Sequence, residues 1–183
     1  MSTLPMIEPE RATGDAKALL DQVAEAFGLV PNMTKAMANS PALLGGYLQL
    51  SDALTQGSFG PGLRERIAIT VAEANGCAYC LSAHTYLGAQ IAKVDSTELD
   101  RAREAGSEDA HTGAVLRLAR AIARDRGRVG AEVIADVRAA GVTDAEIAET
   151  VAHVAVNVLT NYFNNLAGTE NDWPVVTPRS RAA

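Results

Sequence analysis

The chain has 183 residues, of which 22 are acidic and 16 basic, so its net charge is −6 and its isoelectric point is near 5.1. This balance argues against a nucleic-acid partner, because binding to a phosphate backbone needs a cluster of Lys and Arg that the sequence lacks. No apolar run reaches the roughly 18 residues of a membrane-spanning helix, so we expect no membrane association. With 48% hydrophobic residues, the composition predicts one globular domain over residues 1–183.

Alanine dominates the composition, with 34 copies, whereas aromatic residues make up only 4%. Alanine is a strong helix former and a weak strand former, so we expect an all-α fold, a compact single-domain helical bundle. The segment 1–9 lacks the apolar stretch of a secretory signal, which predicts a cytoplasmic protein. In that compartment two cysteines indicate redox groups or metal ligands rather than a structural disulfide.

Helical periodicity runs through most of the chain and is interrupted by Gly, Pro, Asn and Ser. It predicts about eight helices and a short segment at 32–38; the helices cover residues 15–27, 41–54, 61–74, 77–91, 96–105, 108–126, 130–140 and 143–168. Ser40 before Pro41 is a predicted N-cap, and Thr143 with Glu146 is a predicted capping box. We expect a helical core over about 15–168 and an irregular tail, 169–183, that docks on the body or on a neighbouring subunit.

The stretch with the clearest chemical meaning runs from Asn75 to His84, with the sequence NGCAYCLSAH. Both cysteines and one of the three histidines fall in it, directly after a helix stop and at the start of a new helix. A helix N-terminus carries unpaired N–H groups and about half a positive charge, which stabilise a thiolate. Cys80 and His84 are four residues apart and share a helix face, so His84 can serve Cys80 as a base more directly than it can serve Cys77.

Two cysteines at this spacing also suit redox chemistry. Peroxide can oxidise a thiolate to a sulfenic acid, which a second thiol resolves to a disulfide. On a regular helix the Cβ atoms of Cys77 and Cys80 would lie about 5–6 Å apart, whereas a disulfide needs about 3.5–4.5 Å. Closing the disulfide would therefore require the first helical turn to loosen.

A nearby carboxylate could hold the His84 imidazole and complete a proton relay. The preceding helix offers Glu65 and Glu73. If the chain turns back at Gly76, Glu73 lies near the start of the second helix and Glu65 faces the part of it just beyond His84. Helix geometry alone does not choose between the two carboxylates.

Other interpretations of the motif stay open. Cys77 and Cys80 could be buried core residues, or they could bind zinc with His84, although a fourth ligand is missing. They could also sense redox state in a non-catalytic oligomeric binding module. A thiol–disulfide oxidoreductase that exchanges with protein or lipoyl dithiols is a further enzymatic alternative.

The last predicted helix carries polar residues among apolar ones. We expect its series of asparagines to line a polar interface or to cap the helix; these are Asn157, Asn161, Asn164 and Asn165. We interpret His153 on the same helix as a satisfied core or interface histidine.

The spacing of Glu65, Cys77, Cys80 and His84 resembles that of the alkylhydroperoxidase AhpD-like branch of the carboxymuconolactone decarboxylase family. Three further segments are typical of that family: VPNM at 30–33, SPALL at 40–44 and NYFNNLAGT at 161–169. The resemblance thus covers most of the chain.

The resemblance implies an all-α homo-oligomer, commonly a trimer or hexamer, that reduces a hydroperoxide substrate as a thiol peroxidase. It implies that Cys80 attacks the peroxide, that Cys77 resolves the sulfenic acid, and that His84 and Glu65 move the proton. The redox-active disulfide would be the only cofactor, with no metal, and a dithiol or lipoyl-type protein would be the reductant.

Two features qualify the resemblance. The best-known members carry a second histidine just before the peroxidatic cysteine, where this sequence has Tyr79, which is therefore a secondary candidate for the site. Glu73 stays a secondary candidate for the relay. The true lactone decarboxylases of the wider family usually lack the cysteine pair, so its presence argues against that activity.

Overall fold

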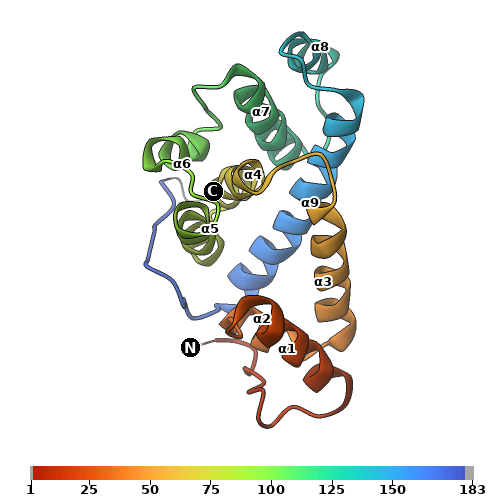
Figure 1. Ribbon diagram of the computed structural model, residues 1–183, viewed down its shortest axis with the longest axis vertical. Coiled ribbons are helices and arrows are strands. Elements are labelled where there is room, and N and C mark those ends of the chain that lie inside the picture. Colours follow the sequence, from red (N-terminus) through yellow and green to blue (C-terminus); the bar gives the residue numbers. More distant parts are fainter. Residues whose placement is uncertain (1, 180–183) are drawn as a thin grey trace.

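The computed structural model describes residues 2–179, in which it contains nine helices and no strand (Figure 1). The helices are α1 (Gly14–Phe27), α2 (Asn32–Met37), α3 (Pro41–Thr55), α4 (Pro61–Ala74), α5 (Ala78–Gln90), α6 (Ser96–Arg103), α7 (Ala110–Asp125), α8 (Ala131–Ala139) and α9 (Asp144–Ala167). The predicted all-α fold is confirmed, and the segment predicted at 32–38 forms the short helix α2. Within the described residues, no helix combines the length and apolar character needed to cross a membrane.

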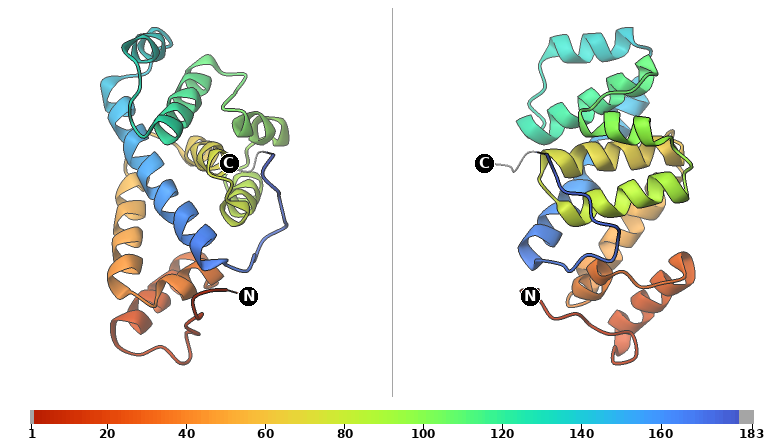
Figure 2. Two further views of the ribbon diagram at one scale, coloured as in Figure 1. Left: turned by 180° about the vertical axis from the view of Figure 1, so that it is seen from behind. Right: turned by 90° about the vertical axis from the view of Figure 1, so that its left-hand side faces the viewer.

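Helix α4 lies at the centre of the molecule. It packs against α5, α6, α7 and α9, and its residues 67–73 are all buried. Figures 1 and 2 show α1 and α2 at one end of an elongated body and α8 at the other, with α9 running along much of its length. The middle of the body, where α4, α5 and α9 meet, is therefore the part best shielded from solvent.

Small residues allow these helices to approach closely. The core contains many buried alanines, among them Ala68, Ala72, Ala102 and Ala119. Gly88 on α5 has the same effect, because a Cβ atom there would lie 2.7 Å from Leu99 Cδ2 and 3.6 Å from Glu65 Cβ. The high alanine content thus serves the packing of α5 against α4 and α6.

The junction between α4 and α5 is a tight turn with defined hydrogen bonds. Gly76 has a φ of 63°, a left-handed conformation that glycine adopts without steric cost. Its N–H donates to the Glu73 carbonyl at 3.2 Å, and the Cys77 N–H donates to the Ala72 carbonyl at 3.0 Å, which together form a Schellman motif. Cys77 is also the N-cap of α5, where its sulfur accepts a hydrogen bond from the Cys80 N–H at 3.3 Å.

The two predicted caps are both present. The Ser40 side chain accepts from the Leu43 N–H at 3.3 Å at the start of α3. At the start of α9, Thr143 and Glu146 form the predicted capping box. The predicted starts of these two helices are therefore confirmed.

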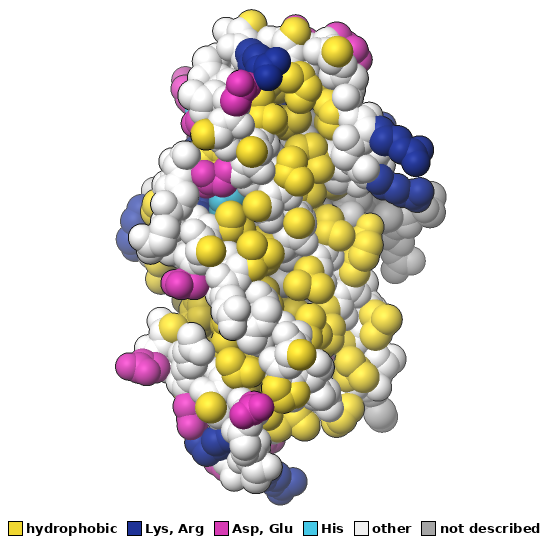
Figure 3. Space-filling view, turned by 90° about the vertical axis from the view of Figure 1, so that its right-hand side faces the viewer, with side chains coloured by type: hydrophobic (Ala, Val, Ile, Leu, Met, Phe, Trp, Pro, Cys, Tyr) yellow, Lys and Arg dark blue, Asp and Glu magenta, His cyan; other side chains and the backbone are white. Residues whose placement is uncertain are grey.

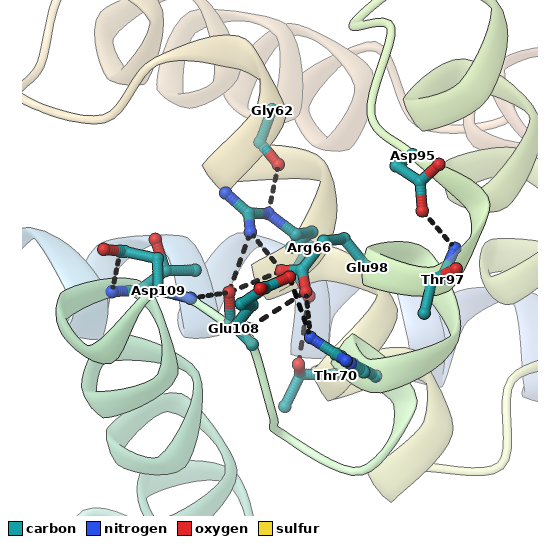
Figure 4. Close-up of polar contacts among 11 residues, drawn as sticks. Gly62, Arg66, Thr70, Asp95, Thr97, Glu98, Glu108 and Asp109 are labelled. Atoms are coloured by element: carbon teal, nitrogen blue, oxygen red, sulfur yellow. Dashed lines mark hydrogen bonds and ion pairs between the residues drawn. The ribbon is translucent and has the colours of Figure 1, made fainter.

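An ion-pair network holds α4 against α6 and the start of α7 (Figure 4). Arg66 Nη1 lies 3.0 Å from Glu98 Oε2, and Arg66 Nε donates to the Gly62 carbonyl at 3.1 Å. Glu98 Oε1 also accepts from the Glu108 N–H at 3.0 Å. Because this network fixes Arg66, it helps to set the rotation of α4 in the turn that carries Glu65.

The segment after α9 runs along the outer side of α5 and ends beside α6 (Figure 1). Asn171 Nδ2 and the Val176 N–H each donate to the buried Ser82 Oγ at 2.9 Å. Arg103 Nη2 donates to the Thr177 carbonyl at 2.8 Å. Of the two positions expected for the tail, the structure thus has it docked on the body over 169–179, while residues 180–183 of the predicted tail lie outside the described residues.

Candidate active site

Cys77 and Cys80 lie buried at the junction of α4 and α5, with exposures of 0% and 2%. Their sulfur atoms are 2.6 Å apart and both are free thiols. Cys77 is an N-cap with φ −89° and ψ 98° rather than a residue of a regular helix. The loosening of the helix that the sequence led us to expect is therefore unnecessary, because the cap conformation already brings the two sulfurs together.

His84 and Glu65 form the second half of the site. His84 Nδ1 lies 2.8 Å from Glu65 Oε2, and both side chains are about three-quarters buried, with exposures of 27% and 21%. The neighbours of Glu65 on α4 have other partners: Arg64 Nη1 donates to the Phe59 carbonyl at 2.9 Å, and Arg66 joins the network with α6. The sequence Arg64-Glu65-Arg66 is therefore not a solvated charged face, since each side chain has a separate partner.

Glu73, the other carboxylate considered from the sequence, lies elsewhere. Its Oε2 accepts from Arg103 Nε at 2.7 Å, and its Oε1 accepts from the Arg179 N–H in the tail. Its side chain is 8% exposed. These partners anchor α6 and the tail to α4, and Glu73 makes no hydrogen bond to His84 among the described contacts.

The surroundings of the two thiols shift their pKa values in opposite directions. Burial opposes ionisation of Cys80, but the hydrogen bond from Cys77, the charge of His84 and the amides of Asn164 and Asn161 together lower the pKa of Cys80 to about 7. The hydrogen bond with Cys80, together with burial, raises the pKa of Cys77. Cys80 is therefore the thiolate of the pair, and Cys77 is its protonated hydrogen-bond donor.

Burial and the partners of His84 shift its pKa in opposite directions. Burial lowers the pKa of His84, but the carboxylate of Glu65 outweighs this, and the net effect is a raised pKa. A protonated His84 next to an ionised Cys80 forms a thiolate–imidazolium pair, in which each charge stabilises the other.

Asn164 on α9 is a site residue that sequence reasoning missed. Its Nδ2 donates to Cys80 Sγ at 3.2 Å, and Asn161 Oδ1 accepts from Asn75 Nδ2 at 2.9 Å. Asn161 and Asn164 are 0% and 3% exposed. The expectation that the asparagines line an interface or cap the helix is therefore wrong for these two, which face the cysteine turn.

A signal for this placement was present in the sequence. Asn157, Asn161 and Asn164 recur at intervals of four and three, which puts them on one face of a helix. Polar groups on an otherwise apolar face need buried partners. The sequence did not identify those partners, because they come from α5 and the turn before it.

Tyr79 points away from the relay. Its hydroxyl donates to Asp172 Oδ2 in the tail at 2.6 Å and accepts from the Met33 N–H at 3.3 Å. Burial and the carboxylate of Asp172 raise the pKa of Tyr79. Tyr79 thus fixes the turn between the cysteines to α2 and to the tail.

Two cavities meet at His84. The first, which we call the apolar pocket, has a volume of about 250 Å³, and Cys80 and His84 form part of its lining. The second, of about 110 Å³, is more polar and is bordered by His84, Glu65, Ser51 and His153. Cys80 borders only the first and Glu65 only the second. A substrate in the apolar pocket would therefore contact Cys80 and His84 but not Glu65.

Over residues 2–179, no group of three or more His, Cys, Asp or Glu side chains is arranged to hold a metal ion. His153 is buried on α9, with its Nε2 3.4 Å from Glu149 Oε1. Nothing in this part of the chain favours the zinc interpretation.

The fold and the site define a class: an all-helical protein in which a buried cysteine pair lies beside a histidine–carboxylate pair. Residues 41–125 match the model of the carboxymuconolactone decarboxylase family. This match over residues 41–125 agrees with the resemblance to that family found in the sequence.

Solved structures share this fold. An AhpD core, a peroxidase-related protein from Ralstonia eutropha JMP134, is 24% identical with a TM-score of 0.83 over 93% of this chain and 92% of that chain. A peroxidase-related protein from Silicibacter sp. TM1040 is 22% identical with a TM-score of 0.78, covering 92% and 89%. The debrominase Bmp8, in complex with 2,3,4-tribromopyrrole, is 17% identical with a TM-score of 0.79, covering 94% and 92%. No curated protein sequence matches the chain.

Proposed function

We propose that this protein is a thiol-dependent hydroperoxide reductase. The observation that carries the proposal is the constellation at Cys80: a thiol with a pKa of about 7 lines a pocket, with a second thiol 2.6 Å away. His84 is the proton donor, and the Glu65 carboxylate, 2.8 Å from His84 Nδ1, holds it in place. A nucleophile, a resolving group and an acid within one site are the parts that two-electron peroxide reduction requires.

The first step breaks the peroxide bond. The Cys80 thiolate attacks the outer oxygen of ROOH, so that an S–O bond forms while the O–O bond breaks. The alkoxide that leaves takes the proton of the His84 imidazolium and departs as ROH. Glu65 acts as a positioning residue, because its carboxylate orients the ring and favours its protonated form.

The second step forms the disulfide. The Cys77 sulfur attacks the sulfur of the Cys80 sulfenic acid; an S–S bond forms, the S–O bond breaks, and the leaving hydroxide combines with the Cys77 proton to give water. An external dithiol, for which we propose a lipoyl-type or protein-borne group, then reduces the disulfide. It becomes oxidised itself, and its two protons restore the thiol of Cys77 and the imidazolium of His84.

The test is consumption of cumene hydroperoxide by the reduced protein with a dithiol reductant in excess. Cys80→Ser should abolish turnover, whereas reduced Cys77→Ser, exposed to peroxide with the dithiol removed, should still consume about one peroxide per chain and stop at the sulfenic acid. Val175→Ala, at an exposed tail residue, is the control and should retain the wild-type rate. Full activity of Cys80→Ser would overturn the proposal.

Parallel assays of the same protein distinguish the alternative functions. Rapid exchange with disulfides and slow reaction with peroxide would indicate a thiol–disulfide oxidoreductase instead. Oxidation of the cysteines without turnover would indicate a redox-sensing module. Since the debrominase Bmp8 shares the fold, 2,3,4-tribromopyrrole is included, and bromide release without peroxide consumption would also overturn the proposal.

A further inference from the structure

The apolar pocket next to Cys80 has aromatic and aliphatic walls from three separate parts of the chain. Its residues come from the end of α1 through α2, from α5 and from the tail, with single contributions from α3 and α9. They are Phe27, Leu29, Pro31, Met33, Thr34, Tyr47, Tyr79, Cys80, Ala83, His84, Tyr86, Leu87, Ile91, Thr160 and Trp173. The pocket is thus a composite feature of the fold rather than a gap within one pair of helices.

Apart from His84, whose charge is already paired with the Cys80 thiolate, the pocket lining contains no residue that could pair with a carboxylate substrate. None of its lining side chains is Lys, Arg, Asp or Glu; its ionisable groups are Cys80, His84 and three tyrosines. Burying a carboxylate without a partner costs several kcal/mol or more. A hydroperoxide that carries a carboxylate, such as that of a fatty acid, is therefore disfavoured.

The size of the pocket limits the substrate further. Sites for drug-sized ligands have volumes of roughly 300–1,000 Å³, and this pocket has about 250 Å³. One ring with a short substituent fits such a volume, whereas a long acyl chain does not. Hydrogen peroxide would fit, but it would leave the apolar walls without contacts.

The tail contributes an aromatic wall that is held in place. The Trp173 and Tyr86 rings have centroids 5.4 Å apart and are tilted by 39°, a spacing typical of interacting aromatic pairs. The Trp173 N–H donates to Asn171 Oδ1 at 3.0 Å, and Asn171 in turn is bonded to Ser82 on α5. Trp173 is therefore presented to the pocket in a fixed position.

The mouth of the pocket exposes large apolar side chains. Nine such side chains are exposed in the described part of the chain, and four of them line this pocket: Phe27, Leu29, Tyr86 and Ile91. Clustered exposed apolar side chains mark binding sites more often than isolated ones do. Here they surround the entrance that leads to Cys80.

We infer that the apolar pocket binds a neutral molecule with a single aromatic ring, and that Trp173 determines the preference for the ring. The part of this inference that concerns reaction rests on the proposed function: the ring would lie between Trp173 and the α1–α2 segment, with its peroxide group at Cys80. The part that concerns binding stands without it.

Binding can be measured without turnover, because Trp173 is the only tryptophan in the chain. The reduced protein is titrated with 2-phenyl-2-propanol, the alcohol that corresponds to cumene hydroperoxide, and tryptophan emission is followed. We expect a saturable change in emission, and at least tenfold weaker binding of benzoate, which has the ring but carries a charge, and of tert-butanol, which is neutral but lacks the ring.

Two variants make the binding test specific. Ala83→Leu fills the pocket and should weaken binding of the alcohol at least tenfold, and Leu29→Asp at the exposed mouth should do the same if Ala83→Leu fails to fold. Val175→Ala, close to Trp173 in the tail but outside the pocket, should bind like the wild type. Absence of saturation, or equal affinity for benzoate, would overturn the inference.

Turnover then tests the role of Trp173. Trp173→Ala should lower kcat/KM for cumene hydroperoxide at least tenfold more than it lowers kcat/KM for hydrogen peroxide. An equal loss with both peroxides would contradict a role in specificity. Binding of the alcohol without any peroxide turnover would support the pocket and reject the proposed function, whereas turnover without binding would do the reverse.

Discussion

Asn164 Nδ2 on α9 lies 3.2 Å from Cys80 Sγ on α5, joining two residues that are 84 positions apart in the chain. Because the amide donates to the sulfur, it stabilises the thiolate relative to the thiol. The acidity of Cys80 therefore depends on the docking of α9 as well as on its place near a helix N-terminus.

Replacing this donor should make Cys80 less acidic. Asn164→Leu keeps the approximate volume and removes the hydrogen bond, and we expect the pKa of Cys80 to rise by about one unit, since hydrogen bonds to charged groups contribute roughly 1.5–3 kcal/mol. The pH dependence of alkylation of Cys80, followed by mass spectrometry, measures the shift. Asn165→Ala, at the exposed neighbouring residue, is the control. An unchanged pKa in Asn164→Leu would show that the contact does not stabilise the thiolate.

The reactivity of Cys80 should follow its own titration. With a pKa of about 7, alkylation of Cys80 should slow as the pH falls through about 7, while Cys77, whose pKa is raised, should stay unreactive at neutral pH. Site-resolved mass spectrometry after brief exposure to iodoacetamide checks this. Faster labelling of Cys77 than of Cys80 would reverse the assignment of the nucleophile.

The same titration should affect stability. Folding lowers the pKa of Cys80 from 9.0 to about 7, so ionisation of Cys80 stabilises the fold fully above pH 9, less between 9 and 7, and not at all once the pH has fallen below about 7. The two-unit shift corresponds to about 2–3 kcal/mol at most. The measurement is the free energy of unfolding of the wild type minus that of Cys80→Ser at several pH values. This difference should grow between pH 7 and 9, and a flat difference would contradict the lowered pKa.

Glu65 and Glu73 should respond differently to the same substitution. Glu65→Gln removes the charge that holds His84 protonated, so we expect peroxide reduction to fall by about 100-fold with little change in stability. Glu73→Gln weakens the buried ion pair with Arg103, so we expect a loss of a few kcal/mol in the free energy of unfolding and nearly unchanged turnover in the folded protein. Steady-state kinetics and denaturant titration on both variants give the comparison, and the opposite pattern would transfer the relay to Glu73.

Much of this architecture could be predicted from the sequence, for local reasons. A helix cap depends on residues only a few positions apart, and the predicted caps at Ser40 and Thr143 are confirmed. The short helix α2 was not predicted as a helix, because six residues cannot show a helical period. The preference for an all-α fold came from composition, and the close approach of helices at its buried alanines shows why that composition suits this fold.

The site was harder to predict, because its contacts join distant parts of the chain. The spacing of Cys80 and His84 is local, whereas the choice between Glu65 and Glu73 depends on the rotation of α4 relative to α5. The Asn164 contact and the Trp173 wall depend on how α9 and the tail pack, which no pattern within either segment specifies. The predicted need for the first helical turn to loosen rested on a regular helix at both cysteines, whereas Cys77 is the N-cap that precedes α5.

The apolar face of α9 predicts self-association, in line with the expected homo-oligomer. Figure 3 shows a long band of hydrophobic side chains on the face of the molecule that carries α3 and α9. Large apolar side chains exposed on α9 include Leu159, Tyr162 and Leu166. Tyr162→Glu should shift the protein toward monomer in analytical ultracentrifugation, because a charge in an apolar interface is costly. Glu25→Gln, on the exposed surface of α1, is the control, and an unchanged assembly in Tyr162→Glu would place the contact elsewhere.

Cys77 ends one helix and begins the next, and this double position limits how the site can be redesigned. Cys77→Ser keeps a side-chain oxygen that can cap α5, so it changes mainly the redox chemistry. Cys77→Ala removes the cap as well, so it changes both the redox chemistry and the start of the helix. An insertion between Cys77 and Cys80 would separate the Cys77 sulfur from the Cys80 N–H that it caps. The sequence spacing of Cys77 and Cys80 is thus determined by the junction between α4 and α5. A longer spacing would need a different connection between these two helices.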